Sequence, residues 1–144
     1  MVIFPNCKIN IGLRVLEKRE DGFHNLETIF YPIPLHDVLE IVITEEAADR
    51  FTQTGLTISG NAADNLCIKA LQLLRQQFSD LPAVHLHLHK MIPMGAGLGG
   101  GSSNGAHCLL LLNQLFNLAL KVEALAEMAL TLGSDCPFFI YNQP

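Results

Sequence analysis

The sequence has 144 residues, of which 49% are hydrophobic and 16% are charged, and its formal net charge at pH 7 is −5. This balance predicts one packed globular domain and excludes an intrinsically disordered chain. The acidic charge, with no cluster of lysine and arginine, argues against nucleic acid as a partner. The longest apolar run is far shorter than the roughly 20 residues that cross a bilayer, and the N-terminus has no signal-type pattern, so we expect a cytoplasmic protein without a membrane partner.

Cysteine usage agrees with a reducing compartment. The four cysteines stand singly among apolar neighbours, at Cys7, Cys67, Cys108 and Cys136, and none belongs to a CxxC pair. We therefore expect buried, reduced thiols and no disulfide framework.

The first predicted element is a strand of alternating character. Apolar side chains alternate with polar residues or glycine over residues 7–15, which is the period of a half-buried strand. Lys8 and Asn10 therefore point to the same side of it. Asp21 and Gly22 form a strong turn signal, so we expect a hairpin or a wide loop to follow.

Two more strands and a helix are predicted in the middle of the chain. Residues 37–46 and the short segment 55–60 have the pattern of strands, and a charged, solvated loop lies between them. From Asp64 to Phe78, apolar residues recur at helical spacing, and Asn61 or Asp64 is available as the N-cap.

Residues 83–91 alternate again and place His85, His87 and His89 on one face of a strand. Three neutral imidazoles suit zinc, but no nearby acid or cysteine completes a four-ligand site. An exposed strand face is therefore the favoured interpretation, with a metal site as the alternative.

The last third of the chain is predicted to be helical. A long apolar run from about Ser103 to Leu120 predicts a mostly buried helix, and residues 121–133 predict an amphipathic helix that Gly133 ends. Strands are concentrated in the first third and helices in the last, so the order of elements predicts an α+β domain. We expect helices on one face of a mostly antiparallel or mixed sheet.

The segment PMGAGLGGGSSNGAH, residues 93–107, carries the strongest functional signal. It lacks the Gly-Lys-Ser/Thr ending of a Walker A loop. A G-x-G-x-x-G match is present, but Pro93 breaks the approaching strand and no acidic residue follows about 20 positions later, which excludes a dinucleotide fingerprint. The pattern instead predicts a bare backbone that approaches phosphate and leads into a helix N-terminus. Ser102 and Ser103 are expected to cap that helix, and their hydroxyls can also donate to phosphate or bind a metal.

The same segment resembles the phosphate-binding motif of the GHMP kinase superfamily, in an extended GLGGGSS form. Three further segments resemble blocks of that family in the same order, namely PNCKIN with IGLRVLEKREDGFHNLETIF, DNL at 64–66, and LTLGSDCPFF at 130–139. The resemblance covers essentially the whole chain. It implies the α+β fold of the GHMP kinase N-terminal domain, which is ribosomal protein S5 domain 2-like.

The resemblance implies that residues 1–144 form the ATP-binding domain and that the family's C-terminal domain is absent from this chain. The implied activity is transfer of the γ-phosphate of ATP, with Mg²⁺, to a hydroxyl of a small-molecule substrate. The DGFH segment points to the branch whose acceptor is a cytidine-diphosphate derivative of methylerythritol, phosphorylated on its 2-hydroxyl in the non-mevalonate isoprenoid pathway. Another GHMP small-molecule kinase and a nucleotide-binding fragment without turnover stay open as alternatives, as does the oligomeric state.

Residue by residue, the resemblance assigns Asp135 as the general base and Lys8 as the cation that keeps it ionised and orients the hydroxyl. An opposite charge within about 4–6 Å favours an ionised acid. Asn10, on the same strand face as Lys8, is expected to bind substrate. Phe23 and His24 match a pair that stacks on cytosine and hydrogen-bonds its edge, with Phe23 replacing the usual tyrosine and lacking its hydroxyl.

ATP binding is assigned to the loop residues Pro93, Gly95, Gly97, Leu98, Gly99, Gly100, Gly101, Ser102 and Ser103. Asn65 and Lys90 match positions near adenine and ribose, and Ser103 is a candidate ligand of Mg²⁺. Beside Asp135, Pro137 is expected to hold Cys136 out of helical geometry.

Overall fold

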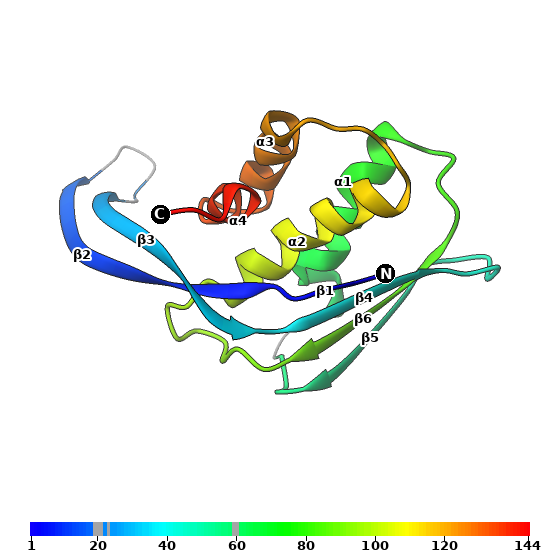
Figure 1. The fold of residues 1–144 in the computed structure, drawn as a ribbon, viewed down its shortest axis with the longest axis horizontal. Helices are drawn as coiled ribbons and strands as arrows, with labels where there is room; N and C mark the ends of the chain where they lie inside the picture. The colour runs from blue at the N-terminus through cyan, green and yellow to red at the C-terminus, as the bar shows by residue number, and fades with distance from the viewer. Residues whose placement is uncertain (19–21, 23, 59–60) are drawn as a thin grey trace.

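The computed structural model describes residues 1–18, 22, 24–58 and 61–144. The helices lie in a layer on one side of a sheet (Figure 1). The strands are β1 Val2–Ile3, β2 Asn6–Lys18, β3 His24–His36, β4 Val38–Ile43, β5 Arg50–Gly55 and β6 Val84–Lys90. The helices are the 3₁₀ turn η1 Ala62–Asp64, then α1 Leu66–Gln77, α2 Gly100–Leu115, α3 Val122–Leu132 and α4 Cys136–Tyr141.

Four strands form the main sheet, in the order β1-β4-β6-β5. Strand β4 pairs antiparallel with both β1 and β6, whereas β5 runs parallel to β6. The predicted α+β domain, with helices on one face of a mixed sheet, is confirmed.

Alternation along β6 builds the core. Val84, Leu86 and Leu88 face the helices and are at most 1% exposed, as the two-residue period of a strand requires. They belong to one apolar cluster with Leu74 of α1 and Leu109 of α2. Helix α2 is buried along most of its length, because α1, α3 and α4 pack around it.

The opposite face of β6 carries the three histidines. Thr52 Oγ1 lies 2.8 Å from both His85 Nε2 and His87 Nδ1. Thr54 Oγ1 lies 3.0 Å from His87 Nε2 and 2.9 Å from His89 Nδ1. The threonines thus fasten the edge strand β5 to β6. Within the described ranges, no three metal-binding side chains are grouped closely enough to hold an ion.

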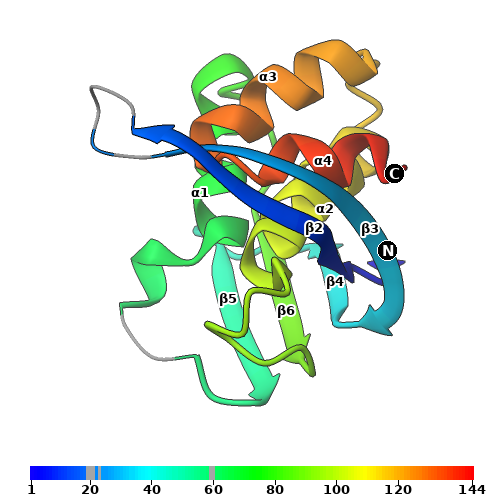
Figure 2. The ribbon, with the colours of Figure 1, turned by 90° about the vertical axis from the view of Figure 1, so that its left-hand side faces the viewer.

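Strands β2 and β3 form a separate hairpin that extends past the main sheet and curves up beside α4 (Figures 1 and 2). Lys18 pairs with His24, which confirms the predicted hairpin, although most of its turn lies outside the described residues. The expected half-buried apolar face is wrong beyond Cys7, because Ile11 is 48% and Leu13 is 58% exposed. Only the first residues of β2 lie under the helix layer, and the described chain leaves the rest of that face uncovered.

Two predicted boundaries shift in the structure. A strand was predicted at residues 55–60, of which 59 and 60 lie outside the described residues, whereas β5 spans Arg50–Gly55, the residues that pair with β6. Helix α2 begins at Gly100, earlier than predicted, and ends at Leu115. Asn117 and Ala119 adopt positive φ angles of 51° and 55°, so the chain turns back there instead of continuing the helix.

The cap of α1 also differs from the prediction. Asn65 is the N-cap, and its Oδ1 accepts a hydrogen bond from Cys67 N at 2.9 Å. Asn61 Oδ1 instead accepts from Ala63 N at 3.0 Å, at the start of η1. Both asparagines have a side-chain oxygen that can accept a hydrogen bond at the start of a helix, but only the tertiary structure shows which helical turn each one caps.

Helix α4 is an element that the sequence pattern did not indicate. It begins at Cys136, with Asp135 as its N-cap residue and Pro137 in its first turn. Proline is tolerated there, because the first N–H groups of a helix have no partner within the helix. The expectation that Pro137 holds Cys136 out of helical geometry is therefore wrong.

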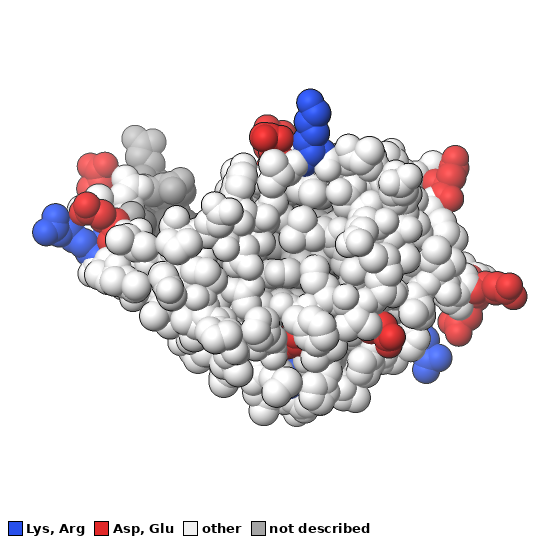
Figure 3. All heavy atoms as spheres, viewed as in Figure 1, with Lys and Arg blue, Asp and Glu red and all other residues white. Residues whose placement is uncertain are grey.

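Several global expectations can be compared directly with the structure. The four cysteines are free and buried, as predicted. In the part of the chain that the structure describes, none of the helices has the length and apolarity to cross a membrane. On the face shown in Figure 3, charged side chains lie mainly at the margins, and lysine and arginine are scattered.

Candidate active site

The glycine-rich loop leads directly into the N-terminus of α2. Gly99 is the N-cap residue, and its φ of 68° lies in the left-handed region that favours glycine. Ser102 and Ser103 lie inside the first turns of the helix, so their predicted role as caps is wrong. The first N–H groups of a helix have no partner within it, and the helix dipole is positive at this end. The end of α2 therefore suits an anion.

A cavity of about 260 Å³ follows the loop. Its lining residues are Leu66, Pro93, Met94, Gly95, Ala96, Gly97, Leu98, Gly99, Gly100, Gly101 and Ser102. Every loop residue predicted to bind ATP is among them except Ser103. Gly95 and Gly97 have φ angles of 70° and 73°, and a Cβ on either would meet nothing within 4 Å. At these two positions, glycine is favoured by the backbone conformation alone.

Two other glycines are required by close contact. A Cβ on Gly99 would lie 3.0 Å from the ring of Phe139 and 3.2 Å from Cγ and Cε of Lys8. A Cβ on Gly100 would lie 2.8 Å from Ile92 Cγ2 and 3.0 Å from Lys90 Nζ. These two glycines therefore leave room for side chains that pack close to the loop, including those of Lys8 and Lys90.

Lys8 and Asp135 come from opposite ends of the chain and meet beside this loop. Lys8 Nζ lies 3.5 Å from Asp135 Oδ2. Strand β2 carries Lys8 past the loop, where its backbone N–H donates to Leu98 O at 2.9 Å. Helix α4 begins immediately after Asp135 and holds its backbone in place. The tertiary structure thus forms the charge pair that the resemblance implied.

The two members of this pair differ in exposure. The side chain of Lys8 is 6% exposed, whereas that of Asp135 is 36% exposed. Lys8 Nζ donates to Asn10 Oδ1 at 2.6 Å and lies 4.5 Å from the centre of the Phe30 ring. Asn10 Nδ2 donates in turn to Thr28 Oγ1 at 3.1 Å. The lysine is held in one position, and the carboxylate is the member that a ligand can reach.

The neighbouring thiol adds no charge to this turn. Burial raises the pKa of Cys136, a hydrogen bond with Ser102 opposes the shift, and the charge of Asp135 raises the pKa further. Because desolvation disfavours a buried thiolate, Cys136 stays protonated at neutral pH.

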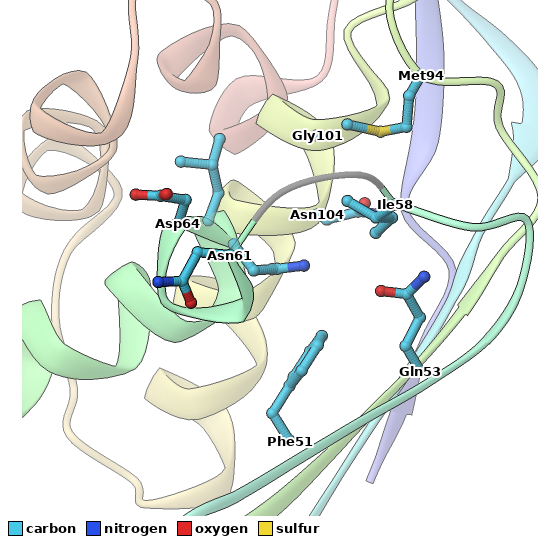
Figure 4. A pocket seen from close by; sticks show the side chains of 10 residues that line it. Phe51, Gln53, Ile58, Asn61, Asp64, Met94, Gly101 and Asn104 are labelled. Atoms are coloured by element: carbon cyan, nitrogen blue, oxygen red, sulfur yellow. The ribbon is translucent and has the colours of Figure 1, made fainter.

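A second cavity, of about 270 Å³, adjoins the loop (Figure 4). It shares with the loop cavity the residues Leu66, Met94 and Gly101. Figure 4 shows Phe51 and Gln53 of β5 on one side and Asn61 and Asp64 on another. An apolar cavity with an aromatic ring and a few polar groups suits a flat ring with polar edges, such as a nucleobase.

Of the residues around this second cavity, the sequence indicated Asn65 and Gly101 as ligand-binding residues. Asn65 lines the cavity while its Oδ1 accepts the Cys67 N–H. Phe51, Gln53 and Ile58 also line it. No local motif in the sequence marks these three residues. Phe51 also lies outside the strand that was predicted, which spans residues 55–60.

Lys90 and Ser103 are not open to a ligand in this structure. Lys90, predicted near adenine and ribose, is 1% exposed and donates from Nζ to Asp37 Oδ2 at 2.5 Å. Ser103, predicted to bind Mg²⁺, is fully buried, and its hydroxyl lies 3.2 Å from His107 Nδ1. Helical periodicity turns Ser103 inward, whereas Ser102 lines the loop cavity.

The predicted cytosine-binding residues are only partly described. Phe23 lies outside the described residues, and His24 is described only by its backbone. The register of the hairpin places His24 opposite Lys18, near the turn, and Asn10 opposite Phe30. Asn10 therefore joins Lys8 and Asp135, whereas His24 lies farther along the hairpin.

His107 makes the stability of this region depend on pH. Burial lowers the pKa of its imidazole from the ordinary 6.5, and a hydrogen bond to the Ser103 carbonyl, 2.9 Å from Nδ1, opposes the shift. The folded chain then takes up this proton at lower pH than the unfolded chain. This contribution to the free energy of unfolding is complete above pH 6.5 and is lost as the pH falls through the folded-state pKa.

Replacing His107 with glutamine is expected to weaken that pH dependence. Urea unfolding at neutral pH and at a pH below 6.5 measures the free energy of unfolding of both proteins. The wild type should lose more of it on acidification than His107→Gln, because the other titrating groups are common to both. Equal losses in the two proteins would contradict the expectation.

Comparison with known proteins identifies relatives of the whole chain. Residues 65–143 match the family model of the GHMP kinases N terminal domain. The chain is 56% identical over 146 residues to 4-diphosphocytidyl-2-C-methyl-D-erythritol kinase of Bacteroides fragilis, covering 100% of the chain and 53% of the relative. The kinase of the same name from Porphyromonas gingivalis is 51% identical over 144 residues, with 100% and 52% covered. The chain spans about half the length of the curated relatives it matches.

Solved structures share the architecture. A crystal structure of 4-(cytidine 5'-diphospho)-2C-methyl-D-erythritol kinase matches with a TM-score of 0.81 and 35% identity, over 99% of this chain and 49% of that one. The mevalonate kinase of Methanococcus jannaschii matches with a TM-score of 0.69 and 17% identity, over 98% and 51%. The second likeness shows the fold alone.

Proposed function

Since this chain belongs to the GHMP kinase family, we propose that it binds ATP and provides the phosphoryl-transfer site of a small-molecule kinase. The acceptor we propose is 4-diphosphocytidyl-2-C-methyl-D-erythritol, phosphorylated on its 2-hydroxyl in the non-mevalonate isoprenoid pathway. The relatives that are 56% and 51% identical to the chain carry the name of that kinase, which supports this acceptor over the alcohols of other GHMP kinases.

The Lys8–Asp135 pair beside the open end of α2 is the observation that carries this proposal. Lys8 Nζ is 3.5 Å from Asp135 Oδ2, and a Cβ on Gly99, the N-cap residue of that helix, would lie 3.2 Å from Lys8 Cγ and Cε. In phosphoryl transfer, the protein mainly positions the reactants and stabilises charge. Here an anion site, a fixed cation and a reachable carboxylate occupy one small region.

In the proposed reaction, the ATP phosphates lie along the glycine loop and the adenine enters the adjoining cavity beside Phe51 and Asn65. The acceptor hydroxyl lies next to Asp135. Its oxygen attacks the γ-phosphorus, the bond to ADP breaks, and the hydroxyl proton passes to the carboxylate. Lys8 holds the carboxylate in place and stabilises charge on the transferring group.

Magnesium enters this scheme with the nucleotide, as the complex of Mg²⁺ and ATP. Mg²⁺ prefers oxygen ligands and keeps several waters. Ser103 does not fit as a ligand, because it is buried and lies against His107. The hydroxyl that lines the loop cavity belongs to Ser102, so Ser102, and not Ser103, is the serine that would hold the ion.

We propose that residues of the β2–β3 hairpin bind the acceptor substrate. Asn10 already contacts Lys8, and Phe23 and His24 remain the predicted partners of cytosine. Further along the hairpin, exposed apolar side chains include Ile11, Leu13 and Ile29. We propose that a second domain covers this apolar side.

Two experiments test the proposed function. Calorimetry with ATP and Mg²⁺ on the chain itself should detect one nucleotide site. A fusion of this chain to the C-terminal half of the Bacteroides fragilis relative, hereafter the fusion protein, should transfer phosphate from ATP to 4-diphosphocytidyl-2-C-methyl-D-erythritol. Absence of ATP binding by the folded chain would overturn the proposal. Equal turnover of mevalonate or homoserine by the fusion protein would overturn the assignment of the acceptor.

A further inference from the structure

A buried carboxylate lies beneath the glycine loop, at the junction of β3 and β4. Asp37 is fully buried and accepts four hydrogen bonds. Its Oδ1 accepts from Met91 N at 2.6 Å and Ile92 N at 2.8 Å. Its Oδ2 accepts from Lys90 Nζ at 2.5 Å and Asn104 Nδ2 at 2.8 Å. The carboxylate is therefore satisfied by donors from two separate segments.

These donors lie on the two sides of the loop. Lys90, Met91 and Ile92 form the end of β6 and the entry to the loop at Pro93. Asn104 lies in the second turn of α2, just after the loop. One side chain thus binds both the entry and the exit of the glycine-rich segment.

The same cluster also touches the helix end and the second cavity. A Cβ on Gly100 would lie 2.8 Å from Ile92 Cγ2 and 3.0 Å from Lys90 Nζ, so the first turn of α2 packs close to both residues. Asn104 donates to Asp37 and also lines the cavity beside Phe51. Asp37 and Lys90 line neither that cavity nor the loop cavity. Asp37 and Lys90 can therefore affect the binding of a ligand only indirectly, through the loop and through Asn104.

A glycine-rich loop needs such an anchor. Glycine has more backbone freedom than other residues, so a run of glycines must be held by its ends if it is to keep one conformation. A buried ion pair is a weak source of net stability, because the desolvation of both charges offsets their attraction. Breaking one by removing a single partner is nevertheless costly, because the other charge stays buried.

We propose that Asp37 is a positioning residue that, with Lys90 and Asn104, sets the conformation of the phosphate loop and so the affinity for ATP. This inference rests on the proposed nucleotide site and adds Asp37 and Lys90, which line neither of its cavities. Lys90, predicted from the sequence to contact ATP, acts here from beneath the loop.

The test separates affinity from stability with a single and a double variant. Asp37→Asn keeps the shape of the side chain but leaves the Lys90 ammonium buried without its counter-charge. Asp37→Asn with Lys90→Met removes both charges, so the double variant should regain most of the unfolding stability that the single variant loses. ATP affinity, measured by calorimetry well below the unfolding transition, should nevertheless stay about tenfold weaker than in the wild type.

A matched control is Leu74→Ala. Leu74 is fully buried in the core, two turns beyond Leu66 along α1, and lines neither cavity. Its truncation lowers stability by leaving a void and should leave ATP affinity unchanged.

Two results would overturn the inference, and both differ from failure of the proposed function. Recovery of wild-type ATP affinity in the double variant would show that Asp37 serves only as the structural ion-pair partner of Lys90. A loss of affinity in Leu74→Ala equal to that of the double variant would show that stability alone controls binding. If the wild-type chain itself bound no ATP, the proposed function would fail first.

Discussion

Replacing Asp135 with asparagine is expected to lower kcat of the fusion protein about 100- to 10,000-fold, the range that a positioned general base contributes. Asparagine keeps the shape of the side chain and its contact with Lys8, 3.5 Å away, but cannot accept the proton of the acceptor hydroxyl. Steady-state kinetics on the fusion protein measure kcat. Calorimetry on the chain should show unchanged affinity for ATP, because Asp135 lines neither of the cavities proposed to bind the nucleotide.

The control for this prediction is Asp80→Asn. Asp80 is an exposed acid in the turn after α1, where it accepts a hydrogen bond from Ser79 Oγ at 3.1 Å. Its substitution removes the same charge from the chain and should leave kcat unchanged. If Asp135→Asn turned over as fast as the wild type, Asp135 would not be the proton acceptor.

Replacing Gly99 with alanine is expected to damage both folding and catalysis. The φ of 68° costs a residue with a Cβ about 1–2 kcal/mol. The new Cβ would also lie 3.0 Å from Phe139 and 3.2 Å from two carbons of Lys8, so these side chains must shift. A displacement of about 1 Å at a reacting site can lower the rate about 100-fold. We expect a loss of this order in kcat of the fusion protein, with a lower midpoint of thermal unfolding.

Two other glycines of the same loop separate these causes. Gly97 has a φ of 73° but open space around its Cβ position, so Gly97→Ala should show the backbone cost without the displacement of Lys8. Gly101 lies within α2, and a Cβ there would meet only Met94 Cε at 3.9 Å, so Gly101→Ala should not be destabilised. If Gly99→Ala kept the wild-type kcat, contact between the loop and Lys8 would not be needed for catalysis.

Patterns that involve one segment at a time were enough to predict most of the elements. The alternation of Val84, Leu86 and Leu88 with histidines identifies β6 and its buried face, because a strand turns successive side chains to opposite sides. The apolar spacing of α1 and α3, and Gly133 after the latter, identify two helices. The density of glycine before α2 likewise predicts an anion-binding loop, because only a backbone without side chains can approach a phosphate so closely.

Long-range packing decided what these patterns left open. Period alone shows which side chains share a face, but not which layer covers that face; the apolar side of β2 is thus exposed, whereas Lys8 is buried.

For the same reason, the sequence patterns alone do not show how the residues of the candidate site come together. The pairing of Lys8 with Asp135 and the burial of Lys90 over Asp37 join segments that are distant in sequence. The cavity lined by Phe51 and by loop residues also joins segments that are distant in sequence. The residue types and the phosphate loop were determined by the sequence itself. Their convergence was decided by the tertiary structure, because contacts between distant segments depend on how the sheet and the helix layer pack together.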